Sequence, residues 1–276
     1  MKRPFFTIVI PTLNEEVYLP RLLTSLARQT FKSFEVIVVD GKSKDKTVEW
    51  AKSFTNTFPK LTIIVHSSPN VCMQRNLGAK HGTGEYFIFF DADVTIPRTF
   101  LSKEYHAIQE KRSMLLTTFV RADSDDPRAQ FAAAISNVGM DIAVFINKPF
   151  VGGYNITMHR GLFEQIHGFD EKVVHAEDHD LVQRAMKAGV RVTILRAPRL
   201  SFSIRRFEKE GYWSLLKKYT TATLFVFLRG PIKKALYDYP MGGQEYAGKV
   251  TVPKGGFTAF ERRLITSIKR VLAYKL

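Results

Sequence analysis

Short apolar runs alternate with amphipathic segments through the first 90 residues. Four runs, each rich in β-branched or aromatic residues, span residues 5–10, 34–39, 61–65 and 86–90. Continuous apolar runs of this length are typical of strands buried on both faces. Between them, apolar residues recur at helical spacing from Leu19, after the expected cap residue Ser43, and over residues 71–80. This alternation predicts a doubly wound α/β sheet.

The pattern becomes less regular after Pro97. Further strands are predicted over residues 115–120, 154–158 and 190–195, and helices over residues 131–145 and 177–188. Residues from 207 onward are basic and aromatic, and are expected to be helical. Because no repeat, low-complexity tract or Gly/Ser linker interrupts the chain, we expect a single domain with a C-terminal extension. Residues 1–206 form one α/β domain, and residues 207–276 form a basic, amphipathic, helical C-terminal extension.

The composition is that of a globular protein. Of the 276 residues, 45% are hydrophobic and 24% are charged, which excludes collagen-like, disordered and disulfide-scaffold proteins. The single cysteine, Cys72, cannot form an internal disulfide, so a cytoplasmic location is expected. The first apolar run stops at Pro11 without a signal-peptide cleavage pattern. Residues 220–228 are about half as long as a membrane span, so no crossing is expected.

The chain is strongly basic, and the excess is uneven. It has 41 Lys and Arg against 26 Asp and Glu, a net charge of +15. Residues 201–276 contribute 15 basic and 5 acidic residues, which is +10 of that +15. Such an excess indicates an anionic partner, whether a nucleic acid, a phosphorylated substrate or acidic lipid.

Carboxylates follow the predicted buried strands. They lie in the turn 11–15, at Asp40, and in the sequence Asp91-Ala92-Asp93. In open α/β sheets ligands bind at the carboxyl ends of the strands, although an Asp in such a place can also be a turn former or a helix cap. Two carboxylates one residue apart, with no Cys/His cluster in the chain, suit Mg²⁺ or Mn²⁺.

A second acidic cluster, Glu177-Asp178-His179-Asp180, stands at the expected start of a helix. Its charges could simply complement the helix macrodipole. Alternatively, one of these carboxylates could act as a general base. The neighbouring His175 and His179 have no spacing that requires a metal.

The order of these motifs resembles glycosyltransferase family 2, the inverting nucleotide-sugar enzymes of GT-A fold. The resemblance covers residues 6 to about 207. It is carried by TIVIPTLNEE (7–16), VIVVDGKSKDKT (36–47), RNLGA (75–79), EYFIFFDAD (85–93), GGYNITMHRGLFEQIHGFDE (152–171) and EDHDLVQRAMKAG (177–189). It implies a GT-A sheet, mostly parallel but mixed, flanked by helices.

The resemblance also implies a role for each matching position. Residues expected to line the nucleotide site are Pro11, Thr12, Asn14, Glu15, Asp40, Arg75 and Asp91. The divalent cation, Mn²⁺ or Mg²⁺, would be held by Asp93 and Asp91. Asp178 would deprotonate the acceptor hydroxyl, and the sugar and acceptor would be bordered by Gly153, Tyr154, Asn155 and Glu177.

These roles imply single-displacement transfer of a sugar from a nucleoside diphosphate, with UDP favoured and GDP second. The acceptor would be a glycan or a lipid-linked hydroxyl. The chain lacks the Gln-x-x-Arg-Trp signature of processive members; its nearest analogue is the segment 203–207. There Arg205 or Arg206 could clamp the diphosphate, or both could belong to a solvated basic turn.

Two other functions fit the sequence less well. A sugar-nucleotidyltransferase should have a Gly-rich loop after the first strand, whereas residues 11–15 contain no glycine. A nucleic-acid-binding protein would explain the basic excess but not the strand-end carboxylates, so no nucleic-acid partner is expected. The basic-aromatic stripes at 212–228 and 257–272 predict peripheral membrane contact, or else packing on the domain.

Overall fold

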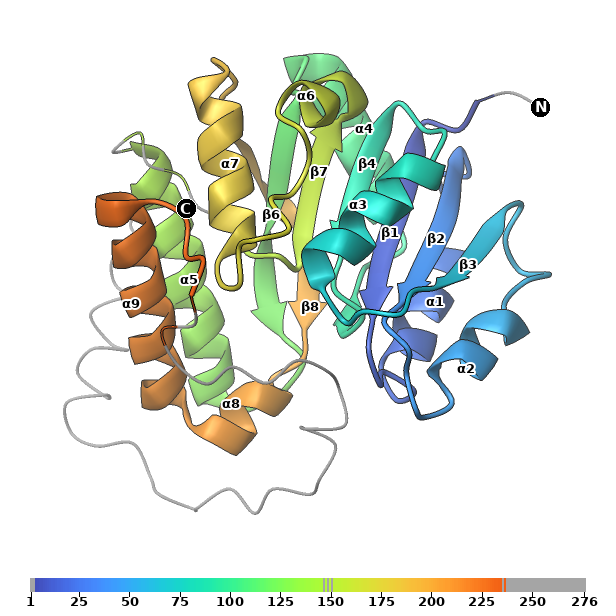
Figure 1. The fold of residues 1–276 in the computed structure, drawn as a ribbon, viewed down its shortest axis with the longest axis horizontal. Coiled ribbons are helices and arrows are strands. Elements are labelled where there is room, and N and C mark those ends of the chain that lie inside the picture. The colour runs from blue at the N-terminus through green and yellow to red at the C-terminus, as the bar shows by residue number, and fades with distance from the viewer. Residues whose placement is uncertain (1–2, 146, 148, 150, 235, 237–276) are drawn as a thin grey trace.

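The computed structural model describes residues 3–145, 147, 149, 151–234 and 236. These residues form one eight-stranded sheet in the order β3-β2-β1-β4-β7-β6-β8-β5, with helices on both faces (Figure 1). The strands are β1 (Phe6–Thr12), β2 (Phe34–Asp40), β3 (Leu61–Val65), β4 (Tyr86–Phe90), β5 (Val94–Thr95), β6 (Leu115–Ala122), β7 (Asn155–His159) and β8 (Thr193–Phe202). The helices are α1 (Leu19–Ala27), α2 (Thr47–Ser53), α3 (Val71–His81), α4 (Phe100–Lys111), α5 (Pro127–Phe145), α6 (Arg160–Gln165), α7 (Glu177–Lys187), α8 (Arg205–Glu210) and α9 (Tyr212–Arg229).

The first half of the sheet is parallel, as the sequence predicts. β1 pairs with both β2 and β4, and β2 pairs with β3, all in parallel. The register joins Thr12 to Asp40 at the ends of β1 and β2. Parallel strands end at a common edge, so the residues that follow β1, β2 and β4 are brought to the same side of the molecule.

The second half of the sheet is mixed. β7 is antiparallel to β4 and β6, while β8 is parallel to β6 and antiparallel to β5. The two-residue strand β5 and the helices α4 and α6 have no counterpart among the predicted elements. The expected cap at Ser43 is wrong, because α2 begins at Thr47 and the Ser43 hydroxyl instead bonds Asp40.

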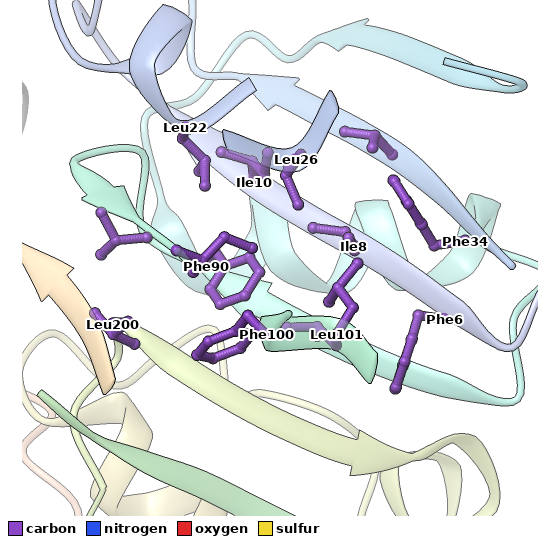
Figure 2. Packing of buried hydrophobic residues seen from close by; sticks show 14 of the residues in the cluster. Phe6, Ile8, Ile10, Leu22, Leu26, Phe34, Phe90, Phe100, Leu101 and Leu200 are labelled. Atoms are coloured by element: carbon purple, nitrogen blue, oxygen red, sulfur yellow. The ribbon is translucent and has the colours of Figure 1, made fainter. Parts of the chain in front are cut away.

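Two hydrophobic clusters cover the faces of the sheet. One packs α1, α2 and α4 on β1, β2 and β4, and includes Ile10, Leu22, Phe90, Phe100 and Leu101 (Figure 2). The other packs α3, α6 and α7 on the opposite face. It contains Cys72, which is buried and whose thiol contacts the backbone oxygen of Val173.

The carboxylic acid of Glu104 is buried against the sheet, and the described residues that hydrogen-bond it are all uncharged. Glu104 on α4 is 0% exposed and accepts hydrogen bonds from Asn155 Nδ2 (3.2 Å) and Thr157 Oγ1 (3.0 Å). Burial raises the pKa of Glu104 from 4.5 to about 7, although these two hydrogen bonds lower it. The Asn155 Oδ1 atom beside it has no hydrogen-bond partner.

Replacing Glu104 with glutamine is expected to stabilise the protein at alkaline pH. Because the folded-state pKa is raised, the folded chain binds more protons than the unfolded chain between about pH 4.5 and 7. The contribution of Glu104 to stability is therefore complete below that window and lost as the pH rises through 7, a change of up to about 3 kcal/mol.

Urea unfolding of wild type and Glu104→Gln at pH 5 and pH 8 measures this effect. The variant should lose less free energy of unfolding between the two pH values, and Glu110→Gln, at an exposed position on α4, should behave as wild type. An unchanged pH dependence in Glu104→Gln would contradict the assignment.

The C-terminal extension packs on the domain as far as the structure describes it. The face of α9 that carries Leu215, Ala222 and Val226 is buried, and α9 contacts α7. In the described part of the chain, no helix is both long and apolar enough to cross a membrane. The expected boundary at residues 206/207 falls inside α8, and the stripe at 257–272 lies outside the described residues.

Candidate active site

Hydrogen bonds connect the loops that follow β1 and β2 at the edge of the sheet. Asp40 is 0% exposed; its carboxylate accepts hydrogen bonds from Thr12 Oγ1 (3.0 Å), from the Ser43 amide (2.8 Å) and from the Ser43 hydroxyl. Asn14, with φ of 55°, accepts a hydrogen bond from the Lys44 amide at 2.8 Å. Pro11 and Thr12 are buried at the end of β1. Glu15, the next predicted nucleotide-site residue after Asn14, donates a hydrogen bond from its backbone amide to Thr47 Oγ1.

Arg205 pairs with both Glu15, which lies 190 residues earlier in the chain, and Asp93. Its two terminal nitrogens each lie 2.7 Å from a carboxylate oxygen of Glu15, and Nη2 lies 3.2 Å from Asp93 Oδ2. The guanidinium also stacks over the ring of Tyr18, with 4.4 Å between Cζ and the ring centroid. Planar bidentate pairing of this kind fixes orientation as well as charge.

The electrostatics of this group are set by burial. Burial, with the nearby charges of Asp93 and Asp91, raises the pKa of Glu15 to about 7, although Arg205 lowers it. Burial also raises the pKa of Asp93, against the lowering effects of Arg205 and Arg206. Carboxylates that are costly to keep charged in the protein are well suited to an added cation.

Arg75 joins the other carboxylate of the pair, Asp91, to the acidic cluster on α7. Its side chain is 1% exposed, and it donates to Asp91 Oδ1 (2.8 Å), Glu177 Oε1 (2.8 Å) and the backbone oxygen of Gly153 (3.1 Å). The guanidinium also lies 5.1 Å from the ring centroid of Phe169. These charges raise the pKa of Arg75 further above its ordinary value, although burial lowers it. Its contact with a nucleotide stays a prediction.

Gly153 provides the space between Arg75 and Asp178. A Cβ atom at this position would stand 2.9 Å from Arg75 Nη2 and 3.6 Å from Asp178 Oδ2. Asp178 is half-buried at the start of α7, and its Oδ1 accepts a hydrogen bond from the His179 amide at 2.8 Å. The sequence motifs 75–79, 91–93, 152–155 and 177–180 therefore meet in one place.

Tyr154 and Asn155 are adjacent in sequence but serve different surroundings. The Tyr154 ring stacks on Phe202, and burial raises the pKa of its hydroxyl. Asn155 is 0% exposed, and its side chain bonds Glu104 and Thr118 Oγ1. The Asn155 side chain therefore belongs to the network around Glu104, and the expected place of Asn155 beside the sugar and acceptor stays a prediction.

Asp91 and Asp93 fit a divalent cation by the chemistry of their donors. Each binds an arginine through one oxygen, and both offer the hard carboxylate oxygens that Mg²⁺ and Mn²⁺ prefer. Among the residues that the structure describes, no group of three or more His, Cys, Asp or Glu could hold a metal. A cation here would complete its shell with substrate phosphates and water, as Mg²⁺ usually does.

Two contacts at this site have no local sequence signal. Tyr18 lies under the Arg205 guanidinium and Phe169 beside that of Arg75. Each aromatic residue is far from its arginine in sequence, so only the fold brings them together.

Comparison with known proteins identifies one family. The family model described as "Glycosyl transferase family 2" matches residues 7–167. A "PGL/p-HBAD biosynthesis glycosyltransferase" of Mycobacterium bovis is 40% identical over 94 residues, which cover 34% of this chain and 37% of that protein. The Staphylococcus aureus poly(ribitol-phosphate) β-N-acetylglucosaminyltransferase TarS is 34% identical over 114 residues, 40% of this chain and 20% of TarS. The matched parts thus span well under half of these relatives.

Solved structures show the same fold. The crystal structure of TarS residues 1–349 superposes with a TM-score of 0.61 and 22% identity, covering 74% of this chain and 62% of that one. A mannosyltransferase of Pyrobaculum calidifontis, in complex with GDP-Man and Mn²⁺, gives 0.63 at 22% identity, covering 80% and 65%. With the mixed sheet, the strand-end carboxylates and a family match over more than half of its length, the chain belongs to glycosyltransferase family 2.

Proposed function

We propose that this glycosyltransferase moves a sugar from a nucleoside diphosphate to an acceptor hydroxyl with inversion, in a single displacement. One observation carries the proposal: Arg75 bonds both Asp91, beside the nucleotide edge, and Glu177, next to Asp178. Arg75 thereby joins Asp91 to the acidic pair, and Gly153 lies beside both Arg75 and Asp178. A displacement needs both ends of the reaction within that reach.

Asp93 and Asp91 are the residues proposed to hold the divalent cation. Bound there, the cation would supply Lewis-acid stabilisation of the charge that develops on the leaving nucleoside diphosphate. Arg205 and Arg206 would add positive charge at the same position, because both already lower the pKa of Asp93. Glu15 holds the Arg205 guanidinium in plane through two hydrogen bonds.

Asp178 is the proposed general base. It would take the proton of the acceptor hydroxyl as the oxygen attacks the anomeric carbon on the face opposite the diphosphate, which inverts the configuration. The hydrogen bond from the His179 amide fixes Oδ1, so Oδ2, on the Gly153 side, is the oxygen proposed to accept the proton. Glu177 is engaged by Arg75 and is therefore the weaker candidate for the base.

UDP is the favoured nucleotide, and GDP is second. Crystal structures of TarS include complexes with UDP and with UDP-GlcNAc, and the Pyrobaculum enzyme was solved with GDP-Man. Asp40 is the proposed partner of the nucleobase; it lies at the end of β2, hydrogen-bonded to Thr12 and Ser43. The proposed acceptor is a hydroxyl of a glycan or of a lipid-linked acceptor. The proposal includes no membrane contact, since α9 buries one face on the domain.

A thermal-shift panel tests the donor. UDP-sugars with Mn²⁺ should raise the melting temperature most, because a ligand that binds only the folded state stabilises it by mass action. GDP-sugars and dTDP-sugars under the same conditions are the controls for nucleotide choice, and EDTA is the control for the metal. If no nucleoside diphosphate sugar shifts the melting temperature with any divalent cation, the proposed function is wrong.

A further inference from the structure

The residue that precedes the acidic pair on α7 has an unusual backbone. Ala176 is the N-cap of α7 and has φ of 56° and ψ of 42°, in the left-handed region. Residues with a Cβ atom rarely adopt this conformation, and such strain persists only where the surroundings impose it. Since Glu177 and Asp178 follow directly, the conformation of Ala176 sets the direction in which both carboxylates leave the loop.

The chain after α9 supplies the surroundings. The Val174 amide donates to the Ile232 backbone oxygen at 2.9 Å, and Ile232 forms an antiparallel bridge with His175. Ile232 is 1% exposed and clusters with Ala222 and Val226 of α9, against which Ala176 packs. Lys233 adds an ion pair to Asp170 at 3.4 Å. The loop that leads to the acidic pair is therefore held by residues 232–233.

Gly230 makes this return of the chain possible. It ends α9 with φ of 87° and ψ of −158°, a combination that residues with side chains avoid. The turn at Gly230 redirects the chain from the axis of α9 toward residues 174–175. Earlier in the same chain segment, the side chain of Asn70, the N-cap of α3, donates to the Glu171 backbone oxygen at 3.2 Å.

We infer that the segment 230–233 is a positioning element for the proposed base, with Ile232 as its anchor. It acts through the loop 173–176, whose left-handed Ala176 it holds against α9, and touches no substrate. Without this support the loop would relax, and Asp178 Oδ2 would leave its place beside Gly153. The C-terminal extension is thereby part of the catalytic machinery. This inference rests on the proposed role of Asp178.

The test is Ile232→Ala in the 276-residue chain, assayed well below its melting temperature. The expected result is a kcat lower by about ten- to a hundredfold, with little change in donor affinity, because a small misplacement of a reacting group is costly. Ile232→Val should restore most of the rate. Hydrogen exchange of the peptide 173–180 should rise in Ile232→Ala and return toward wild type in Ile232→Val.

Ile108→Ala is the matched control, since Ile108 is a buried isoleucine of α4 in the hydrophobic cluster that α1, α2 and α4 form on the sheet, away from Ile232 and α9. It should be destabilised by the same kind of truncation yet keep its kcat and its exchange at 173–180. An Ile232→Ala enzyme with wild-type kcat, or an Ile108→Ala enzyme with the same loss, would overturn the positioning role. If Asp178→Asn also retains full activity, the proposed base itself fails, and the two failures are thus distinguished.

Discussion

Replacing Asp178 with asparagine is expected to lower the rate of sugar transfer by about 10²–10⁴-fold, the usual contribution of a general base. Asparagine has the same shape, and its amide oxygen can still accept the hydrogen bond from the His179 amide. The change therefore removes the proton acceptor without disturbing the start of α7. Donor affinity should change little, because the donor is proposed to bind at the β1, β2 and β4 edge.

Transfer and donor affinity are measured separately, by release of the nucleoside diphosphate and by calorimetry. Asp180→Asn is the matched control, since it removes one charge from the same helical turn while Asp180 pairs with Arg184. It should leave most of the transfer activity. A fully active Asp178→Asn enzyme would move the base to Glu177, the remaining carboxylate of the pair.

Asp93→Ala is expected to abolish the metal-dependent part of nucleotide binding. Arg205 keeps both hydrogen bonds to Glu15 in this variant, so the surrounding structure should persist. The burial that raises the pKa of Asp93 also makes its charge costly, and the variant should unfold no more readily than wild type. UDP should bind it equally with Mn²⁺ and with EDTA.

Calorimetric titration of UDP in the presence and absence of Mn²⁺ gives the comparison. Asp123→Ala is the control, because Asp123 pairs with Arg21 at the surface and not with Arg205, the partner of Asp93. It should retain the metal dependence of the wild type. Tight, Mn²⁺-dependent binding of UDP to Asp93→Ala would show that Asp93 does not hold the cation.

The parts of the fold that sequence could predict are those that leave a local pattern. β3 and β4 have the predicted bounds, because each is a mostly apolar run with sharp ends. Only β4 has the predicted burial on both faces, since β3 lies at the edge of the sheet and is half-buried. β5 has two residues, too few for any periodicity. Its place depends on pairing with Ser201 and Phe202, more than 100 residues away.

The candidate site divides in the same way. Strand-end position and motif order indicate Asp40, Asp91 and Asp93 without a structure. They do not indicate the direction of a side chain. Asn155 is the first residue of β7, and its side chain joins the buried hydrogen-bond network around Glu104. The pairing of Glu15 with Arg205 has no sequence signal, because it closes a loop of 190 residues.

The Glu15–Arg205 pair also bears on how the site is completed during synthesis. The parallel edge from β1 to β4 consists of neighbouring segments and can form from the first 90 residues, whereas closing a long loop costs entropy that only late contacts repay. Arg205 and Ile232 leave the ribosome after every strand of the sheet. A nascent or truncated chain that ends before Arg205 would therefore carry the edge proposed to bind the nucleotide, but without the Arg205 guanidinium and without the anchor of the α7 loop. Such a chain is expected to bind a donor unproductively.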